Sequence, residues 1–207
     1  MKQVYFIRHG ETDNNKNRLL QGRKINASIN EKGREQAKAI ADALADVPIK
    51  KIVTSSLVRA IETAEPLMIS KNLDSDQYEE LDEMSFGDWD GRPFSEVISP
   101  IKAVQEAWIA GETNTQIPGG ESPEEVFERA GKKVIHILNT AEEQYLAFIV
   151  HGRLIRILLS KFLGFGLQNM HLIKHSNGAI NHLTWDGDKF EAVKLNSTEH
   201  LPEEEIA

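Results

Sequence analysis

Residues 4–12 read Val-Tyr-Phe-Ile-Arg-His-Gly-Glu-Thr, and they decide how the rest of the chain is interpreted. The first four residues form an apolar run, which predicts a buried β-strand. The run stops abruptly at Arg8, His9 and Gly10. The end of this strand therefore predicts the carboxyl edge of a sheet, which is where open α/β folds bind their ligands.

The three residues that end the strand have complementary chemistry. Arg8 offers a planar fork of donors that suits phosphate oxygens. His9 can act as a nucleophile, a base or a metal ligand. Gly10 allows a tight turn and a close approach of the backbone to a ligand. The segment is therefore a candidate site, and we look to the rest of the chain for its partners.

A second strand-to-helix junction repeats this pattern. Residues 145–150 are the most strand-like run of the chain, and they lead through His151 and Gly152 into an apolar helix over 154–163. One histidine after a strand is more often a hydrogen-bonding residue than a catalyst. Two strands that both end in His-Gly predict that the two histidines meet at one edge of a sheet.

A third junction supplies an arginine. Residues 51–54 predict a strand that enters a helix at Ser55 and Ser56, with serine as the N-cap. Arg59 then falls in the first helical turn, where the helix dipole disfavours a cation. Either Arg59 extends into solvent, or it faces an anion that the helix end also attracts. The setting beside two His-Gly junctions favours the anion.

The remaining pattern alternates helices with strands, which predicts an α/β fold. Ser122 begins a capping box, so Glu124 and Glu125 are expected to be structural. We predict helices over 34–45 and 123–141, one or two helices around Pro100 over 93–110, a hairpin over 179–195, a turn over 118–122, and loops over 13–24, 81–91 and 175–178.

Composition limits the function further. The 207 residues fit one domain over 1–207, in which we expect 199–207 to be a disordered acidic tail. A net charge of -8 argues against a general nucleic-acid surface, and the absence of cysteine excludes thiolate catalysis. No apolar segment approaches the length of a membrane span, and the N-terminus does not resemble a secretory signal. We therefore expect a cytoplasmic protein with no membrane or nucleic-acid partner.

Two kinds of site fit two histidines near a carboxylate. The loop over 81–91 offers Glu83, with Asp82, Asp88 and Asp90 as alternatives, although most loop carboxylates are simply solvated. A metal site is one possibility. Two fixed arginines would repel a divalent cation and would favour a phosphate dianion. Charge balance therefore selects phosphoryl chemistry, with no metal or cofactor.

Four motifs resemble those of the histidine phosphatase superfamily, the phosphoglycerate mutase-like proteins. They occur in the family's order along essentially the whole chain. They are Arg-His-Gly-Glu-Thr-x-x-Asn over 8–15, Ser-Ser-x-x-Arg-Ala-x-x-Thr-Ala over 55–64, Glu-x-x-x-Gly-x-x-x-Gly over 83–91, and the less specific Pro-Gly-Gly-Glu-Ser over 118–122.

The resemblance implies a three-layer α/β/α fold with a mostly parallel central sheet. It implies that His9 is the nucleophile, that Glu83 is the proton donor, and that Arg8, Arg59 and His151 bind the phosphoryl group. We expect His151 to act as a cation and Asn15 to add a neutral donor. The further substrate-binding candidates are Gln21, Gly22, Gly152 and Arg153.

Departures from the mutase pattern bear on the substrate. The mutases usually have an arginine after the acid, where this chain has Met84, and residues 93–118 contain no arginine. We therefore predict a metal-independent phosphomonoesterase of the small-molecule phosphatase branch. The alternatives are a bisphosphoglycerate-dependent phosphoglycerate mutase and a non-catalytic phosphate-binding protein. The expected partner is a small phosphorylated metabolite, and the oligomeric state is left open, with a homodimer as one candidate.

Overall fold

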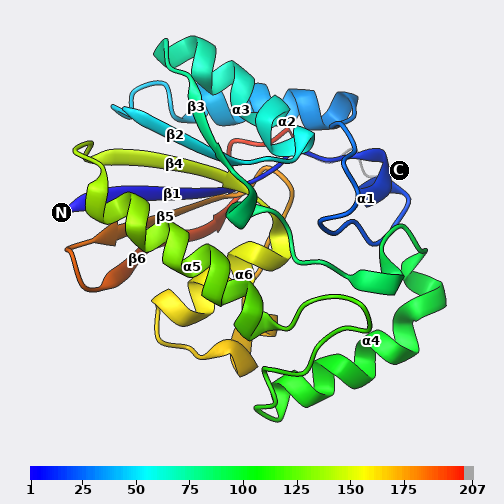
Figure 1. Cartoon of the computed structure of the whole chain (residues 1–207). Coiled ribbons are helices and arrows are strands. Elements are labelled where there is room, and N and C mark those ends of the chain that lie inside the picture. The colour runs from blue at the N-terminus through cyan, green and yellow to red at the C-terminus, as the bar shows by residue number, and fades with distance from the viewer. Residues whose placement is uncertain (203–207) are drawn as a thin grey trace.

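A six-stranded sheet forms the centre of the protein in the computed structural model, which describes residues 1–202 (Figure 1). The strand order is β3-β2-β4-β1-β5-β6. Neighbours among β3, β2, β4 and β1 are parallel, whereas β5 runs antiparallel to both β1 and β6. The strands are β1 (Lys2–Arg8), β2 (Lys51–Ser55), β3 (Ser75–Tyr78), β4 (Tyr145–Val150), β5 (Ile180–Trp185) and β6 (Phe190–Ser197).

Helices cover both faces of this sheet, as the alternation of buried side chains along the strands requires. In β1, Val4 and Phe6 join one apolar cluster, and Tyr5 and Ile7 join the other. Helices α2 (Glu31–Ala43) and α3 (Val58–Lys71) pack on the Tyr5 face. On the opposite face lie α5 (Pro123–Thr140) and α6 (Gly152–Phe162), with α4 (Phe94–Ile109) at the periphery (Figure 1). The three-layer α/β/α prediction is confirmed.

Several local predictions differ from the structure. The polar loop over 13–24 contains a short helix α1 (Asp13–Lys16), because Thr12 and Asn15 form a capping box. Helix α4 continues through Pro100 without a break. Strand β3 and a 3-10 helix (Leu167–Leu172) were not predicted.

The N-terminus of α3 also differs from the prediction. Its N-cap is Leu57, which makes no side-chain capping bond. Ser56 instead donates through its backbone N and its Oγ to Asp82 Oδ1 at 3.0 and 2.8 Å. Ser55 Oγ lies 2.7 Å from Nε2 of His151. Both serines therefore bind residues that are distant in the sequence, and neither caps the N-terminus of α3.

The predicted acidic tail lies only in part within the described residues. Leu201 N donates to Thr198 O at 3.0 Å, and His200 Nε2 lies 3.1 Å from Gly178 O. Residues 199–202 thus lie against the loop at Gly178. The remainder of the predicted tail, 203–207, falls outside the described residues.

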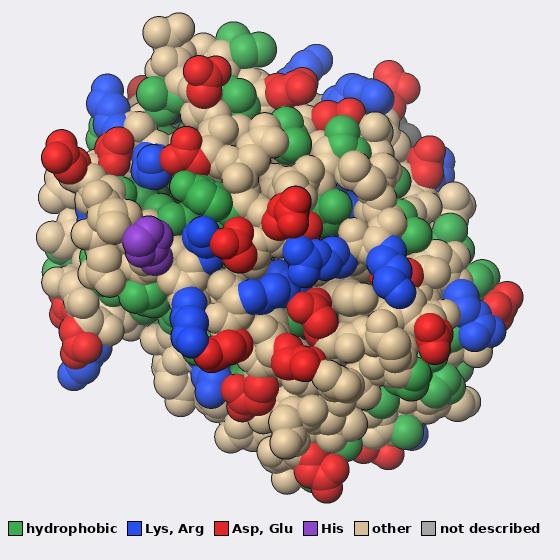
Figure 2. Space-filling model, in the orientation of Figure 1, with side chains coloured by type: hydrophobic (Ala, Val, Ile, Leu, Met, Phe, Trp, Pro, Cys, Tyr) green, Lys and Arg blue, Asp and Glu red, His purple; other side chains and the backbone are tan. Residues whose placement is uncertain are grey.

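Charges of both signs are interspersed on the face shown in Figure 2. On α5 and α6, ion pairs join Lys132 to Glu128 and Lys161 to Glu124. This mixture is typical of a solvated surface.

No helix within residues 1–202 is both long and apolar enough to cross a membrane.

The turn that follows β1 packs tightly against the start of α2. An ideal β-carbon on Gly10 would lie 2.5 Å from Gly33 O, and one on Gly33 would overlap Glu11 O. Asn30 N donates to Glu11 O at 2.8 Å, which fixes the same approach. Two glycines therefore allow the backbone of the turn to rest on the backbone of the helix.

Replacing Gly33 with alanine should lower the free energy of unfolding by about 1–3 kcal/mol, because backbone atoms cannot move aside for the new β-carbon. Chemical denaturation would measure this loss. Gly131→Ala is the matched control, since the nearest atoms to its β-carbon would belong to the side-chain ring of Phe127, 2.7 Å away, which can rotate, and not to the backbone. An equal loss in both variants would contradict the backbone explanation.

Candidate functional site

The ends of β1, β2 and β4 bring the predicted residues together. Because β4 lies between β1 and β2, their carboxyl ends are adjacent at one edge of the sheet. The rings of His9 and His151 lie 5.2 Å apart between centroids. The charges of Arg8 and Arg59 act on both rings, and Glu83 binds the backbone just after His151. The structure thus gathers Arg8, His9, Arg59, Glu83 and His151 at one place.

His9 is held with one ring nitrogen free to react. Its Nδ1 lies 2.7 Å from Gly10 O, and a carbonyl oxygen can only accept, so Nδ1 carries the proton. Nε2 is then the unprotonated nitrogen. Burial, followed by the charges of Arg59 and Arg8, lowers the pKa of His9 well below its usual value. A neutral imidazole with an unprotonated Nε2 is the form that a nucleophile needs.

Arg59 is completely buried, which rules out the solvent-exposed alternative. Its Nη1 donates to Ile25 O at 2.6 Å, and its Nη2 lies 3.4 Å from Gly22 O. The amide of Gln21 is oriented so that its nitrogen donates to Thr12 Oγ1. Its oxygen then accepts from Nε and Nη1 of Arg59, at 3.1 Å each. Burial lowers the pKa of Arg59 to about 10, which leaves it charged near neutral pH. In this structure, Gln21 and Gly22 hold Arg59.

Glu83 accepts three hydrogen bonds from the backbone. Its Oε1 accepts from Met84 N at 2.8 Å and from Leu154 N at 3.0 Å, and its Oε2 accepts from Arg153 N at 3.0 Å. Two of these donors belong to the first turn of α6, where no side chain of the helix itself provides a cap. Glu83 therefore occupies the positive end of the helix that follows His151.

The three alternative carboxylates differ in position. Asp82 accepts from Ser56 and lies 3.4 Å from Arg23 Nε. Asp90 Oδ1 accepts from Gly22 N at 2.7 Å, and Asp88 is exposed. Of these four acidic residues, only Glu83 is joined by hydrogen bonds to α6.

The surroundings of His151 oppose the cationic form that we expected. Its Nε2 lies 2.7 Å from Ser55 Oγ, and its Nδ1 is buried without a hydrogen-bond partner in the described part of the chain. Burial, followed by the charges of Arg59, His9 and Arg8, lowers the pKa of His151 well below its usual value. These surroundings disfavour the charged form of His151, and an anion placed among the arginines would raise its pKa.

Arg8 packs against the backbone at the start of α6. An ideal β-carbon on Gly152 would lie 3.0 Å from Arg8 Nε, so the absence of a side chain at Gly152 leaves room for the guanidinium. Arg8 Nη1 donates to His175 O, while Nε is buried with no partner among residues 1–202. Burial lowers the pKa of Arg8 to about 10. Arg8 therefore keeps its charge and retains donor capacity.

Asn15 and Asn177 support the loop that carries His9. Asn15 Oδ1 accepts from Thr12 N in the capping box of α1 at 3.3 Å and from Asn177 Nδ2 at 3.1 Å. Asn177 Nδ2 also lies 3.1 Å from His9 O. The Oδ1 of Asn15 is therefore occupied by hydrogen bonds within the protein, and Nδ2 is the atom that could act as the expected donor to a ligand. Asn177 was not predicted, because it stands in a loop 168 residues from His9.

Arg129 on α5 is a second residue that sequence reasoning missed. It donates to the carbonyl oxygens of Glu80, Asp82 and Glu83 at 2.7, 2.9 and 3.1 Å. It also pairs with Glu121 through Nε and Nη2 at 2.7 and 2.9 Å. Arg129 thus fixes the backbone on which Glu83 stands, and nothing in its local sequence distinguishes it from a surface arginine of an amphipathic helix.

No three histidine, cysteine, aspartate or glutamate side chains within residues 1–202 are grouped as a metal site requires.

The chain matches the model of the histidine phosphatase superfamily (branch 1) over residues 4–198. A protein of Hydrogenobacter thermophilus, provisionally named phosphoserine phosphatase 2, is 29% identical over 97% of this chain and 98% of its own. Phosphoglycerate mutase-like protein 4 of Arabidopsis thaliana is 27% identical over 97% and 87%. A mycobacterial glucosyl-3-phosphoglycerate phosphatase, solved with VO3, is 27% identical with a TM-score of 0.86 over 96% of this chain and 100% of its own.

Arg129→Gln should lower the free energy of unfolding by about 2–3 kcal/mol, because it leaves Glu121 and three carbonyl oxygens without their donor. Denaturant unfolding would measure the loss. Lys132→Gln, an exposed change one turn along α5, is the control. A loss no larger than that of the control would show that the network does not hold the loop.

Stability should fall with acidity because of the two buried histidines. The pKa of each is lowered in the folded state, so below about pH 6.5 the unfolded chain binds protons that the folded chain does not. We expect a loss of about 1 kcal/mol per histidine between pH 6.5 and pH 5.5. Denaturant unfolding of wild type and His9→Asn at both pH values tests this, since the variant should lose about 1 kcal/mol less. Equal losses would contradict a neutral His9.

Proposed function

The chain belongs to the histidine phosphatase superfamily, and on that premise we propose that it hydrolyses phosphomonoesters of small metabolites through a phosphohistidine at His9. One observation carries the proposal. His9 presents an unprotonated Nε2 within the field of two arginines, the partly buried Arg8 and the fully buried Arg59. A neutral nucleophile beside fixed cations suits attack on a dianionic phosphoryl group.

The first step transfers the phosphoryl group to the enzyme. The Nε2 lone pair of His9 attacks phosphorus in line, and the bond from phosphorus to the alcohol oxygen breaks. Glu83 enters this step protonated and gives its proton to the leaving oxygen, because an alkoxide is a poor leaving group. Its Oε2 accepts one hydrogen bond where Oε1 accepts two, so Oε2 has room for that proton. Gly10 O stabilises the cationic imidazole that results.

The second step releases phosphate. Glu83, now ionised, takes a proton from water as the water oxygen attacks phosphorus and the bond to His9 Nε2 breaks. Arg8 and Arg59 offset the charge of the equatorial oxygens in both steps. Ser55 Oγ accepts a hydrogen bond from Leu57 N, so its own hydrogen is free to be donated to His151 Nε2. The proton of the neutral His151 ring then lies on Nδ1, which can donate it in a hydrogen bond to a phosphoryl oxygen. These groups supply the charge that magnesium supplies in other phosphoryl-transfer sites.

A mutase is the second candidate, because relatives carry mutase names. A mutase must hold a second acidic group while the phosphoryl group returns from the histidine. In residues 93–118 Lys102 is the sole lysine or arginine, and it is exposed and paired with Glu106. This scarcity of cations favours hydrolysis.

Phosphate release with EDTA present is the test of the reaction. The purified protein should release phosphate from an aryl phosphate and from members of a panel of phosphorylated metabolites, and His9→Ala should lose nearly all of this turnover while remaining folded. The same samples would be assayed for interconversion of 2- and 3-phosphoglycerate, with and without 2,3-bisphosphoglycerate. Isomerisation that depends on the bisphosphate would establish the mutase instead.

Glu83→Gln tests the proton donor. Glutamine keeps one oxygen for the α6 backbone but cannot supply the proton. We expect kcat/KM for alkyl phosphates to fall about 100-fold or more, and kcat/KM for p-nitrophenyl phosphate, whose leaving group needs no proton, to fall far less. Equal losses for both substrate types would reassign the acid.

A further inference from the structure

Two segments of the chain beside the site are paired with each other. Residues 18–22 lead into the segment that holds Arg59, and residues 90–94 follow the loop that carries Glu83. Three backbone hydrogen bonds of 2.8–2.9 Å join them, from Leu20 N to Arg92 O, from Gly91 N to Leu20 O and from Phe94 N to Arg18 O. A side chain makes the next bond, because Gly22 N donates to Asp90 Oδ1 at 2.7 Å. Asp90 thus extends the pairing to the residue whose carbonyl oxygen faces Arg59.

The two oxygens of the Asp90 carboxylate differ in their surroundings. Oδ1 accepts from Gly22 N, whereas Oδ2 is buried and has no hydrogen-bond partner in the described part of the chain. A buried carboxylate oxygen without a partner costs stability. The role of Asp90 must therefore come from the contact of Oδ1.

Gly22 also packs closely against the residue that follows Glu83. An ideal β-carbon on Gly22 would overlap Asp90 Oδ1 and would lie 2.6 Å from Met84 O. Met84 N itself donates to Glu83 Oε1 at 2.8 Å. The loop of Glu83 therefore rests on Gly22 at two points, at Met84 and at Asp90.

A second link lies on the other side of Glu83. Asp82 Oδ1 accepts from N and Oγ of Ser56, which stands three residues before Arg59. Asp82 Oδ2 lies 3.4 Å from Nε of Arg23, in the segment that holds Arg59. Carboxylates on both sides of Glu83 therefore bind the segments that carry or hold Arg59.

The spacing of Glu83 and Arg59 matters because both must act on one phosphoester. Arg59 offsets charge on the phosphoryl oxygens, while Glu83 must reach the leaving oxygen on the same phosphorus. A misplacement of about 1 Å in such a constellation can cost about 100-fold in rate. Glu83 lies in a loop and Arg59 is held by one, so contacts between the two loops set this spacing.

We propose that Asp90 is a positioning residue of the reaction. Through Gly22 it fixes the loop of the proton donor Glu83 against the segment that holds Arg59. This inference rests on the proposed function, because it assigns a role in that reaction to a carboxylate that touches no reacting atom.

Kinetics with two kinds of leaving group test this role. Asp90→Ala should lower kcat for alkyl phosphates about 10- to 100-fold and change KM less than about threefold, because Arg59 keeps Gln21 and Ile25 O as partners. Turnover of p-nitrophenyl phosphate, which needs no proton donor, should fall far less. In a Glu83→Gln background, Asp90→Ala should add little, since the proton that it positions is gone. A full additional loss in that background would overturn the positioning role.

Two substitutions in the same loop are the matched controls. Asp90→Asn keeps an oxygen that can accept from Gly22 N, so it should restore most of the rate that Asp90→Ala loses. Asp88→Ala removes an exposed carboxylate two residues away and should change the turnover of neither substrate. If Asp90→Asn is as slow as Asp90→Ala, the bond to Gly22 does not explain the effect and the proposal fails.

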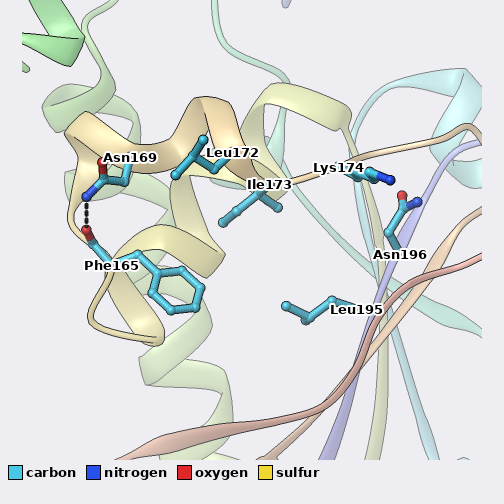
Figure 3. Close-up of a pocket in the computed structure, with 7 residues that line it drawn as sticks. All are labelled: Phe165, Asn169, Leu172, Ile173, Lys174, Leu195 and Asn196. Carbon is cyan, nitrogen blue, oxygen red and sulfur yellow. Dashed lines mark hydrogen bonds between the residues drawn. The ribbon is translucent and has the colours of Figure 1, made fainter.

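A destabilising change elsewhere separates positioning from a general loosening of the fold. Figure 3 shows Phe165, Ile173 and Leu195 around an apolar groove of about 520 Å³, and no residue that lines this groove belongs to 18–25 or 80–94. Phe165→Ala removes a ring beyond the far end of α6 from His151. It should leave the ratio of alkyl to aryl turnover at the wild-type value. A shift of this ratio as large as that of Asp90→Ala would contradict a specific role for Asp90.

Amide hydrogen exchange separates this inference from the proposed function, because it needs no turnover. The amides of Gly22 and of residues 84–91 should exchange about tenfold or more faster in Asp90→Ala, and close to the wild-type rate in Asp90→Asn and Asp88→Ala. Unchanged exchange in Asp90→Ala would show that Asp90 does not hold the two loops together. Failure of hydrolysis with the faster exchange intact would overturn only the proposed function.

Discussion

The rest of the site depends on one constraint, which is that a fully buried arginine, Arg59, and a partly buried one, Arg8, lie near two histidines of lowered pKa. Arg59 is completely buried, yet its partners are carbonyl and amide oxygens, which satisfy its donors without cancelling its charge. Burial and then this retained charge lower the pKa of His9, and the charge also creates a place for an anion. Glu83 lies close enough to act on these cations but is itself held by backbone N–H groups. Asp82 and Asp90 also act on Arg59, yet none of these carboxylates forms an ion pair with Arg8 or Arg59 within residues 1–202.

The sequence was sufficient to predict the fold class and the residues that meet at the sheet edge. Apolar runs that end in Arg-His-Gly or His-Gly can be recognised locally in the sequence. The two strands that they form, β1 and β4, are neighbours in the sheet, so the residues at their ends lie side by side. Arg59 was predictable for a related reason, because a cation in a first helical turn is unfavourable unless an anion or a set of acceptors compensates it. The family match over residues 4–198 agrees with this interpretation.

The supporting residues could not be predicted, because their roles arise only from tertiary contacts. Arg129 holds the backbone of residues 80–83 from another helix, and Asn177 reaches His9 O across the chain. Ser55 and Ser56 have the sequence of a helix cap, yet they bind His151 and Asp82. Strand β3 was missed because Ser75–Tyr78 is short and has no buried residue, so no apolar pattern marks it. The protonation of His151 depends on burial beside two arginines, which no local pattern reveals.

The position of β4 has a consequence for biosynthesis. The strands β1 and β2 do not pair with each other, since β4 lies between them and is made almost a hundred residues after β2. Until Tyr145–Val150 has left the ribosome, the facing edges of β1 and β2 have no partner, and exposed strand edges favour aggregation. The nascent chain must therefore remain protected or uncollapsed for most of its synthesis, and the same late strand delivers His151. The strand that joins β1 to β2 is thus also the strand that places His151 beside His9.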